Sequence, residues 1–92
     1  MTRYPIALRI SFEGGTGVTR SVSREEVRFV TDHPPVVGQT IEGTLCPPSA
    51  DDGLLTRLCY TARVMAIRRP DGGVWEVEAR FERLGFTIPE AV

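Results

Sequence analysis

Strict alternation of apolar and polar residues late in the chain constrains its fold more than any other feature of the sequence. One alternating stretch runs over residues 57–64 and a second over residues 75–82. A period of two is typical of a strand with one buried face. Between the two stretches, residues 69–73 (Arg-Pro-Asp-Gly-Gly) favour a tight turn. The sequence therefore predicts a long antiparallel hairpin with arginines opposite glutamates on its outer face. The residues expected to point inward are Leu58, Tyr60, Ala62, Val64, Trp75, Val77, Ala79 and Phe81.

Four shorter strands are predicted before this hairpin. They cover residues 6–12, residues 16–22, a stretch that begins at Val27, and residues 40–45. Glycine turns and a proline-rich crossing loop over residues 32–37 separate them. The segment Ser23-Arg24-Glu25-Glu26 matches a helix capping box, but no helical stripe follows it, so we expect a single tight turn.

Three irregularities are expected within the strands. Arg20 interrupts the apolar face of the second strand, which predicts either a bulge or a face that meets water or a ligand. The alternation changes phase over residues 65–67, which predicts another bulge or a bend. Gly85 is expected to end the last strand.

Six short strands and no long helical pattern predict an all-β fold, a small six-stranded antiparallel β-barrel with no substantial helix. A closed barrel removes exposed strand edges, and a barrel of this size is filled by its own side chains. The 92 residues support one domain over residues 1–92. A ligand is therefore expected on the outer surface or at a rim.

Composition and charge exclude several classes of protein. Eleven basic against twelve acidic residues, with few aromatic ones, argue against a nucleic-acid-binding barrel. No apolar run is long enough to span a bilayer and the N-terminus lacks a signal-peptide core, so we expect a cytoplasmic protein without membrane insertion. All basic residues are arginine, which fits either phosphate recognition or codon bias. The two cysteines lack metal-ligand spacing and are expected to stay reduced.

The sequence offers little for catalysis. His33 is the one histidine, and it stands beside two prolines in a loop. The glycines of residues 14–17 lack the lysine of a phosphate-binding loop and lie between strands, so we interpret them as a hairpin turn. Adjacent carboxylates at residues 25–26 and 51–52 would diverge rather than hold a metal. We expect no enzyme activity, no metal and no cofactor.

The turn between the second and third strands resembles the second motif of the PilZ family, Asp/Asn-x-Ser-x-x-Gly. Ser23 matches the serine of that motif, whereas Ser21 replaces the acid or amide and Glu26 replaces the glycine. Later parts of the chain are similar to the family as well, so that the resemblance covers roughly residues 6–84. It implies a small β-barrel of a family in which many members bind the bacterial messenger cyclic di-GMP.

The first PilZ motif, Arg-x-x-x-Arg, is missing. Arg3 and Arg9 are the N-terminal arginines, and five residues separate them instead of three. In nucleotide-binding members, the paired arginines are expected to hold phosphates and guanine edges through bidentate contacts. Glu26 also adds a negative charge close to where an anionic ligand would lie. The family's usual C-terminal helix is absent from the sequence pattern.

Two functions are compatible with this pattern. The first is a degenerate PilZ-like adaptor of cyclic di-GMP-related signalling that contacts proteins of unknown identity, or copies of itself as a homo-oligomer, without binding the nucleotide. Its expected contact residues are the apolar side chains of Val30, Met65 and Val74. The alternative is a cyclic di-GMP-binding domain with substitute arginines. Its ligand-binding residues would be Arg3, Arg9, Arg20, Ser21, Ser23 and Arg24.

Overall fold

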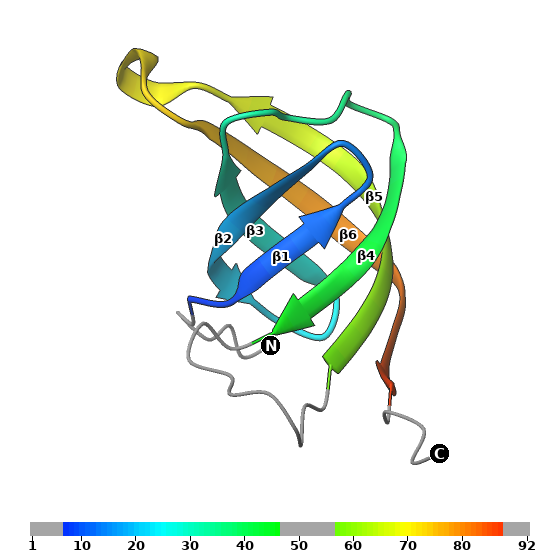
Figure 1. The fold of residues 1–92 in the computed structure, drawn as a ribbon. Coiled ribbons are helices and arrows are strands. Elements are labelled where there is room, and N and C mark those ends of the chain that lie inside the picture. Colours follow the sequence, from blue (N-terminus) through cyan, green and yellow to red (C-terminus); the bar gives the residue numbers. More distant parts are fainter. Residues whose placement is uncertain (1–6, 47–56, 88–92) are drawn as a thin grey trace.

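The computed structural model describes residues 7–46 and 57–87, which form a closed six-stranded antiparallel β-barrel (Figure 1). Around the barrel the strands follow the order β1-β2-β3-β6-β5-β4, and β4 closes onto β1. A short 3₁₀ turn, η1 (Pro70–Gly72), is the only helical element within the described residues. The predicted barrel is thus confirmed. The strands are β1 (Arg9–Phe12), β2 (Gly15–Val22), β3 (Glu26–Thr31), β4 (Thr40–Cys46), β5 (Arg57–Arg68) and β6 (Trp75–Thr87).

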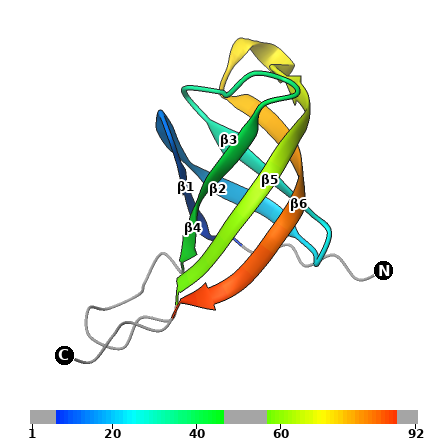
Figure 2. The ribbon, with the colours of Figure 1, turned by 90° about the vertical axis from the view of Figure 1, so that its right-hand side faces the viewer.

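The loop over residues 32–39 crosses one end of the barrel from β3 to β4 (Figure 2). It is bonded to β5 at its far end, where the Gly38 amide donates to the Val64 carbonyl oxygen at 2.8 Å. The Val64 amide in turn donates to the carbonyl oxygen of Gln39 at 2.9 Å. These bonds replace ladder partners that the short strand β4 does not supply. The predicted crossing loop is confirmed.

Both predicted bulges are present. The register of β2 against β3 shifts between Thr19 and Ser21, and that of β5 against β6 shifts between Val64 and Ala66. The extra residue on the first bulge is Arg20, which is exposed, while Thr19 is buried. Alternation from the buried Thr19 already points Arg20 outward, and the extra residue changes the phase that follows, so that Val22 instead of Ser21 packs against the core.

Two strand ends differ from the sequence prediction. The first strand was expected from residue 6, but β1 begins at Arg9 and residues 1–6 lie outside the described part of the chain. At Leu8 the amide donates to the Thr19 hydroxyl at 2.8 Å instead of to a backbone carbonyl, so the regular ladder starts one residue later. Gly85 was expected to end the last strand, but β6 continues to Thr87.

Pairing with β5 explains why Gly85 does not end the strand. Gly85 lies opposite Cys59, and the pairing continues as far as Thr87 opposite Arg57. A glycine within a strand costs only about 0.5–1 kcal/mol relative to alanine. The two further backbone pairs of this long hairpin offset that cost.

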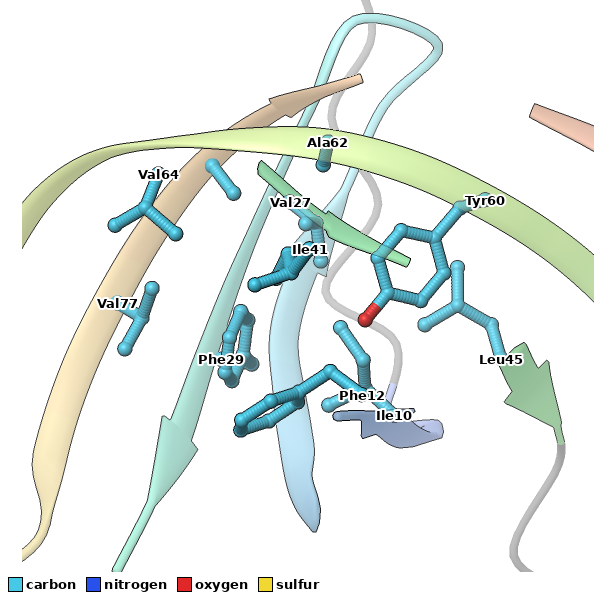
Figure 3. Close-up of a cluster of buried hydrophobic side chains, with 11 residues drawn as sticks. Ile10, Phe12, Val27, Phe29, Ile41, Leu45, Tyr60, Ala62, Val64 and Val77 are labelled. Atoms are coloured by element: carbon cyan, nitrogen blue, oxygen red, sulfur yellow. The ribbon is translucent and has the colours of Figure 1, made fainter. Parts of the chain in front are cut away.

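The interior of the barrel is filled with apolar side chains from five strands (Figure 3), and β2 adds the buried Thr19 and the partly buried Val22. Two ring contacts help to hold it together: the Phe12 and Phe29 centroids lie 5.5 Å apart, and Tyr60 meets Phe81 edge-on at 5.9 Å. Such pairs add about 0.5–1.5 kcal/mol beyond the burial of their surface. The buried apolar residues are Ile10, Phe12, Val27, Phe29, Ile41, Leu45, Tyr60, Ala62, Val64, Val77 and Ala79.

Candidate functional site

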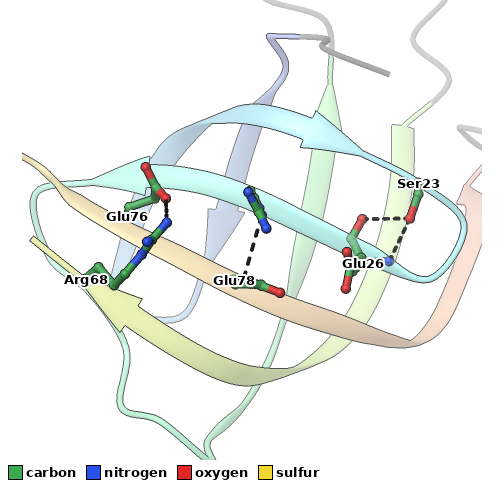
Figure 4. Close-up of polar contacts among 6 residues, drawn as sticks. Ser23, Glu26, Arg68, Glu76 and Glu78 are labelled. Atoms are coloured by element: carbon green, nitrogen blue, oxygen red, sulfur yellow. Dashed lines mark hydrogen bonds and ion pairs between the residues drawn. The ribbon is translucent and has the colours of Figure 1, made fainter. Parts of the chain in front are cut away.

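The Ser23 hydroxyl is fully engaged within its own turn. Its Oγ accepts a hydrogen bond from the amide of Glu25 at 3.2 Å. It also accepts one from the amide of Glu26 at 3.1 Å and donates to the Glu26 carbonyl oxygen at 3.3 Å (Figure 4). The side chain is buried, with 5% of the residue exposed. The amide of Phe81 on β6 donates to the Glu25 carbonyl oxygen at 2.8 Å and fixes the turn against the barrel. Ser23 therefore holds a structural corner and presents no hydroxyl to a ligand.

Of the other predicted binding residues, only Arg24 belongs to this turn. Arg20 stands on the bulge of β2, and Arg24 is exposed at the tip of the turn. Arg9 lies on β1, opposite Val18, on the outer wall of the barrel. Ser21 is half-buried and lies opposite Arg28 of β3. Arg3 lies outside the described residues.

Ion pairs occupy the outer wall beside Ser21. Arg28 Nε lies 3.6 Å from Glu78 Oε2, across the β3–β6 ladder (Figure 4). On the neighbouring hairpin, Arg68 lies directly opposite Glu76 and its Nη2 approaches Oε1 to 2.6 Å. The predicted arrangement of arginine opposite glutamate is therefore present at this pair, whereas Arg63 lies opposite Arg80 and reaches Glu82 at 3.9 Å. An anion at Ser21 would have to compete with the Glu78 carboxylate for the Arg28 guanidinium.

A groove of about 650 Å³ lies elsewhere, on the outer wall over β4, β1, β2 and β3; we call it the outer groove. Its floor is apolar at the centre, where Val18 and Val30 stand on paired positions of β2 and β3. Val18 is 44% exposed and Val30 is half-buried. The residues that line it are Arg9, Ile10, Ser11, Thr16, Gly17, Val18, Val30, Thr31, Asp32, Thr44, Cys46 and Val74.

The strand register explains how the outer groove is built. Arg9 lies opposite Val18, and Val18 lies opposite Val30, so these three form one row across the wall. Gly17 pairs with Thr31, which brings Asp32 beside Thr16 in the next row of outward side chains. Because strand residues alternate between faces, both rows point away from the buried core. The groove thus combines an apolar centre with a cation on β1 and an anion directly after β3.

Sequence reasoning found part of this site. Val30 and Val74 were expected as exposed contact residues, and both line the outer groove, although Val30 is half-buried. Met65 was expected with them; it is 51% exposed but stands on the β5 bulge and does not line the groove. Asp32 was treated only as part of a loop. Asp32 directly follows β3, and continuing the alternation of β3 by two residues from Val30 places Asp32 on the outward face. This pattern could have indicated its position.

The polar groups that line the outer groove include Arg9, Asp32, several hydroxyls and the free thiol of Cys46. Its hydroxyls at Ser11 and Thr44 hydrogen-bond to each other at 2.7 Å. His33, the one histidine of the sequence, is exposed and does not line the groove. No cluster of three or more histidine, cysteine, aspartate or glutamate residues suited to a metal occurs within residues 7–46 and 57–87.

Comparisons with family models, with curated proteins and with solved structures give no match to this chain. In the part of the chain that the structure describes, no helix has the length and apolar character needed to cross a membrane. The function is therefore inferred from the barrel's own surface.

Proposed function

We propose that this protein is a degenerate PilZ-like domain of bacterial cyclic di-GMP-related signalling. It acts in the cytoplasm as a non-catalytic protein-interaction adaptor and does not itself bind the nucleotide. The observation that carries this proposal is the position of the apolar surface. The outer groove, with Val18 and Val30 at its centre, lies over the outer wall of the barrel and away from the Ser23 corner.

The state of the Ser23 corner supports the same conclusion. A dianionic nucleotide needs several hydrogen-bond donors aimed at one point. Here the serine hydroxyl is engaged by its own turn, and Glu25 and Glu26 bring two carboxylates to that turn. Arg24 and Arg20 are exposed without an ion pair to another described residue, and they are the donors that the nucleotide-binding alternative would use.

Isothermal calorimetry with cyclic di-GMP at low ionic strength tests the proposal. We expect no binding heat up to millimolar nucleotide. The wild-type chain is compared with Arg20→Ala and Arg24→Ala, because both side chains are exposed and their loss leaves the core intact. Saturable binding in the micromolar range that is lost in both variants would overturn the adaptor and support the substitute arginines.

A further inference from the structure

The outer groove carries one pair of opposite charges that the single chain does not use. Arg9 and Asp32 both lie exposed at the groove. Neither makes an ion pair with another residue of the described ranges. Elsewhere on the barrel, Arg28, Arg63 and Arg68 each have a glutamate within 4 Å. Other exposed arginines, Arg20 and Arg24 among them, also lack an ion pair within the described residues, but Arg9 and Asp32 are the two charged residues that line the outer groove.

The two charges stand on opposite sides of the apolar centre. Arg9 lies on β1 and Asp32 directly follows β3, with β2 between them. Across the sheet, Arg9 and Asp32 are two strand spacings apart. Along the strands they are one row of outward side chains apart, which is two residues. At about 4.8 Å per strand and about 3.4 Å per residue, this separates their Cα atoms by roughly 12 Å. Val18 and Val30 lie close to the midline between Arg9 and Asp32.

We propose that the outer groove is the face through which two copies of this chain associate. When two identical faces meet about a two-fold axis that lies between them, each residue meets the residue at the mirrored position on the other copy. The required axis lies in the plane of contact and crosses the line from Arg9 to Asp32 at its midpoint, at a right angle. It places Arg9 of each copy on Asp32 of the other. The same axis brings Val18 of one copy against Val30 of the other.

A second copy fits this face because one surface supplies every complementary group. Two Arg9–Asp32 pairs form at once, and the valines at the centre lose water together. Thr31 pairs with Trp75 in the antiparallel β3–β6 ladder, so the next residues, Asp32 and Val74, lie beside each other. Val74 is 43% exposed and extends the apolar contact there. Twelve residues line the groove, against roughly 20–30 on each side of a standard interface. The dimer is therefore expected to be weak, with a dissociation constant on the order of 100 μM.

This inference rests on the proposed protein-interaction role and gives that role its partner and its face. Sedimentation equilibrium of the full chain at low ionic strength tests this inference. The chain concentration runs from about 5 μM to about 1 mM, a range that suits a weak dimer. The wild type is expected to pass from monomer to dimer. Arg9→Asp and Asp32→Arg should each raise the dissociation constant at least about tenfold, because like charges then meet. The double variant, Arg9→Asp with Asp32→Arg, should return it to within about threefold of the wild type.

Val18→Arg and Met65→Arg form a matched pair of controls. Both replace an exposed apolar residue by arginine, but Val18 lines the groove and Met65 does not. Only Val18→Arg should abolish the dimer. Circular dichroism checks that every variant keeps the strand signal of the wild type.

Each other result overturns the inference. A wild type that stays monomeric at 1 mM would exclude the dimer, and the groove would then serve a different protein. A dimer that survives Val18→Arg, or single charge reversals that the double variant does not rescue, would exclude this face. None of these results would touch the proposal that the chain does not bind cyclic di-GMP, because calorimetry tests that separately.

Discussion

The Tyr60 hydroxyl on β5 donates a 2.8 Å hydrogen bond to the backbone carbonyl oxygen of Ser11 on β1. These strands are not neighbours, because β4 lies between them. The bond passes over Gly43 of β4, which pairs with Tyr60 on one side and with Phe12 on the other. A glycine there leaves room for the tyrosine ring and for the close approach of β1. One hydrogen bond thus links three consecutive strands at the point where the barrel closes.

Tyr60→Phe is expected to lower the free energy of unfolding by about 1 kcal/mol. The phenyl ring still fills the core, but the Ser11 carbonyl loses its donor. Urea unfolding followed by tryptophan fluorescence measures the change. Thr61→Val is the matched control, since its hydroxyl makes no hydrogen bond among the described residues. Equal stability of Tyr60→Phe and the wild type would show that the bond contributes nothing net.

Stability is also expected to fall at alkaline pH because of Tyr60. Burial, with 3% of the residue exposed, raises the pKa of its hydroxyl above the ordinary value of about 10. The neutral phenol is therefore favoured in the folded state. This contribution is fully present below about pH 10 and is lost as the pH rises toward the higher folded pKa, by up to about 1.4 kcal/mol per pH unit. Urea titrations between about pH 8 and pH 11.5 should show this decline in the wild type and a smaller one in Tyr60→Phe.

Gly43→Ala is expected to destabilise the barrel severely. A Cβ at this position would lie 1.8 Å from the Ser11 carbonyl oxygen, which is backbone and cannot turn away. Overpacking of this kind costs about 1–3 kcal/mol and can prevent folding. Gly85→Ala is the matched control in β6, because a Cβ there meets nothing within 4 Å. Thermal unfolding by circular dichroism separates the two; similar melting temperatures would contradict the close approach of β1 and β4.

Ser23→Ala should cost about 1 kcal/mol of stability. The substitution removes the acceptor of the Glu25 and Glu26 amides and opens the corner between β2 and β3. Ser21→Ala should change the free energy of unfolding by less than about 0.5 kcal/mol, because its hydroxyl has no hydrogen bond within the described residues. If the two variants prove equally stable, Ser23 does not hold the turn.

The positions of the strands could be predicted from the sequence because alternation and turn chemistry are local. The interruption at Arg20 and the change of phase at residues 65–67 indicated both bulges correctly. The strand end expected at Gly85 was wrong, because pairing with β5 outweighs the weak strand preference of a glycine. Local preference cannot account for a partner strand that continues past that residue.

The candidate site could be predicted only in pieces. Exposed valines at positions 30 and 74 were expected, and the serine of the tight turn was recognised. The use of the Ser23 hydroxyl by its own turn, and the separation of Arg9 from that corner, required the structure.

The sequence by itself determined a small antiparallel barrel with its inward and outward faces, because the period of two assigns each residue to a face without reference to any partner. Only the tertiary structure decided which outward residues share a wall. Arg9, Val18, Val30 and Asp32 come together through the register of β1, β2 and β3. Register depends on how each strand pairs with its neighbour, and a shift of one pair would move every neighbour of these residues. The Tyr60–Ser11 bond has the same origin, since it joins strands that become close only when the barrel closes.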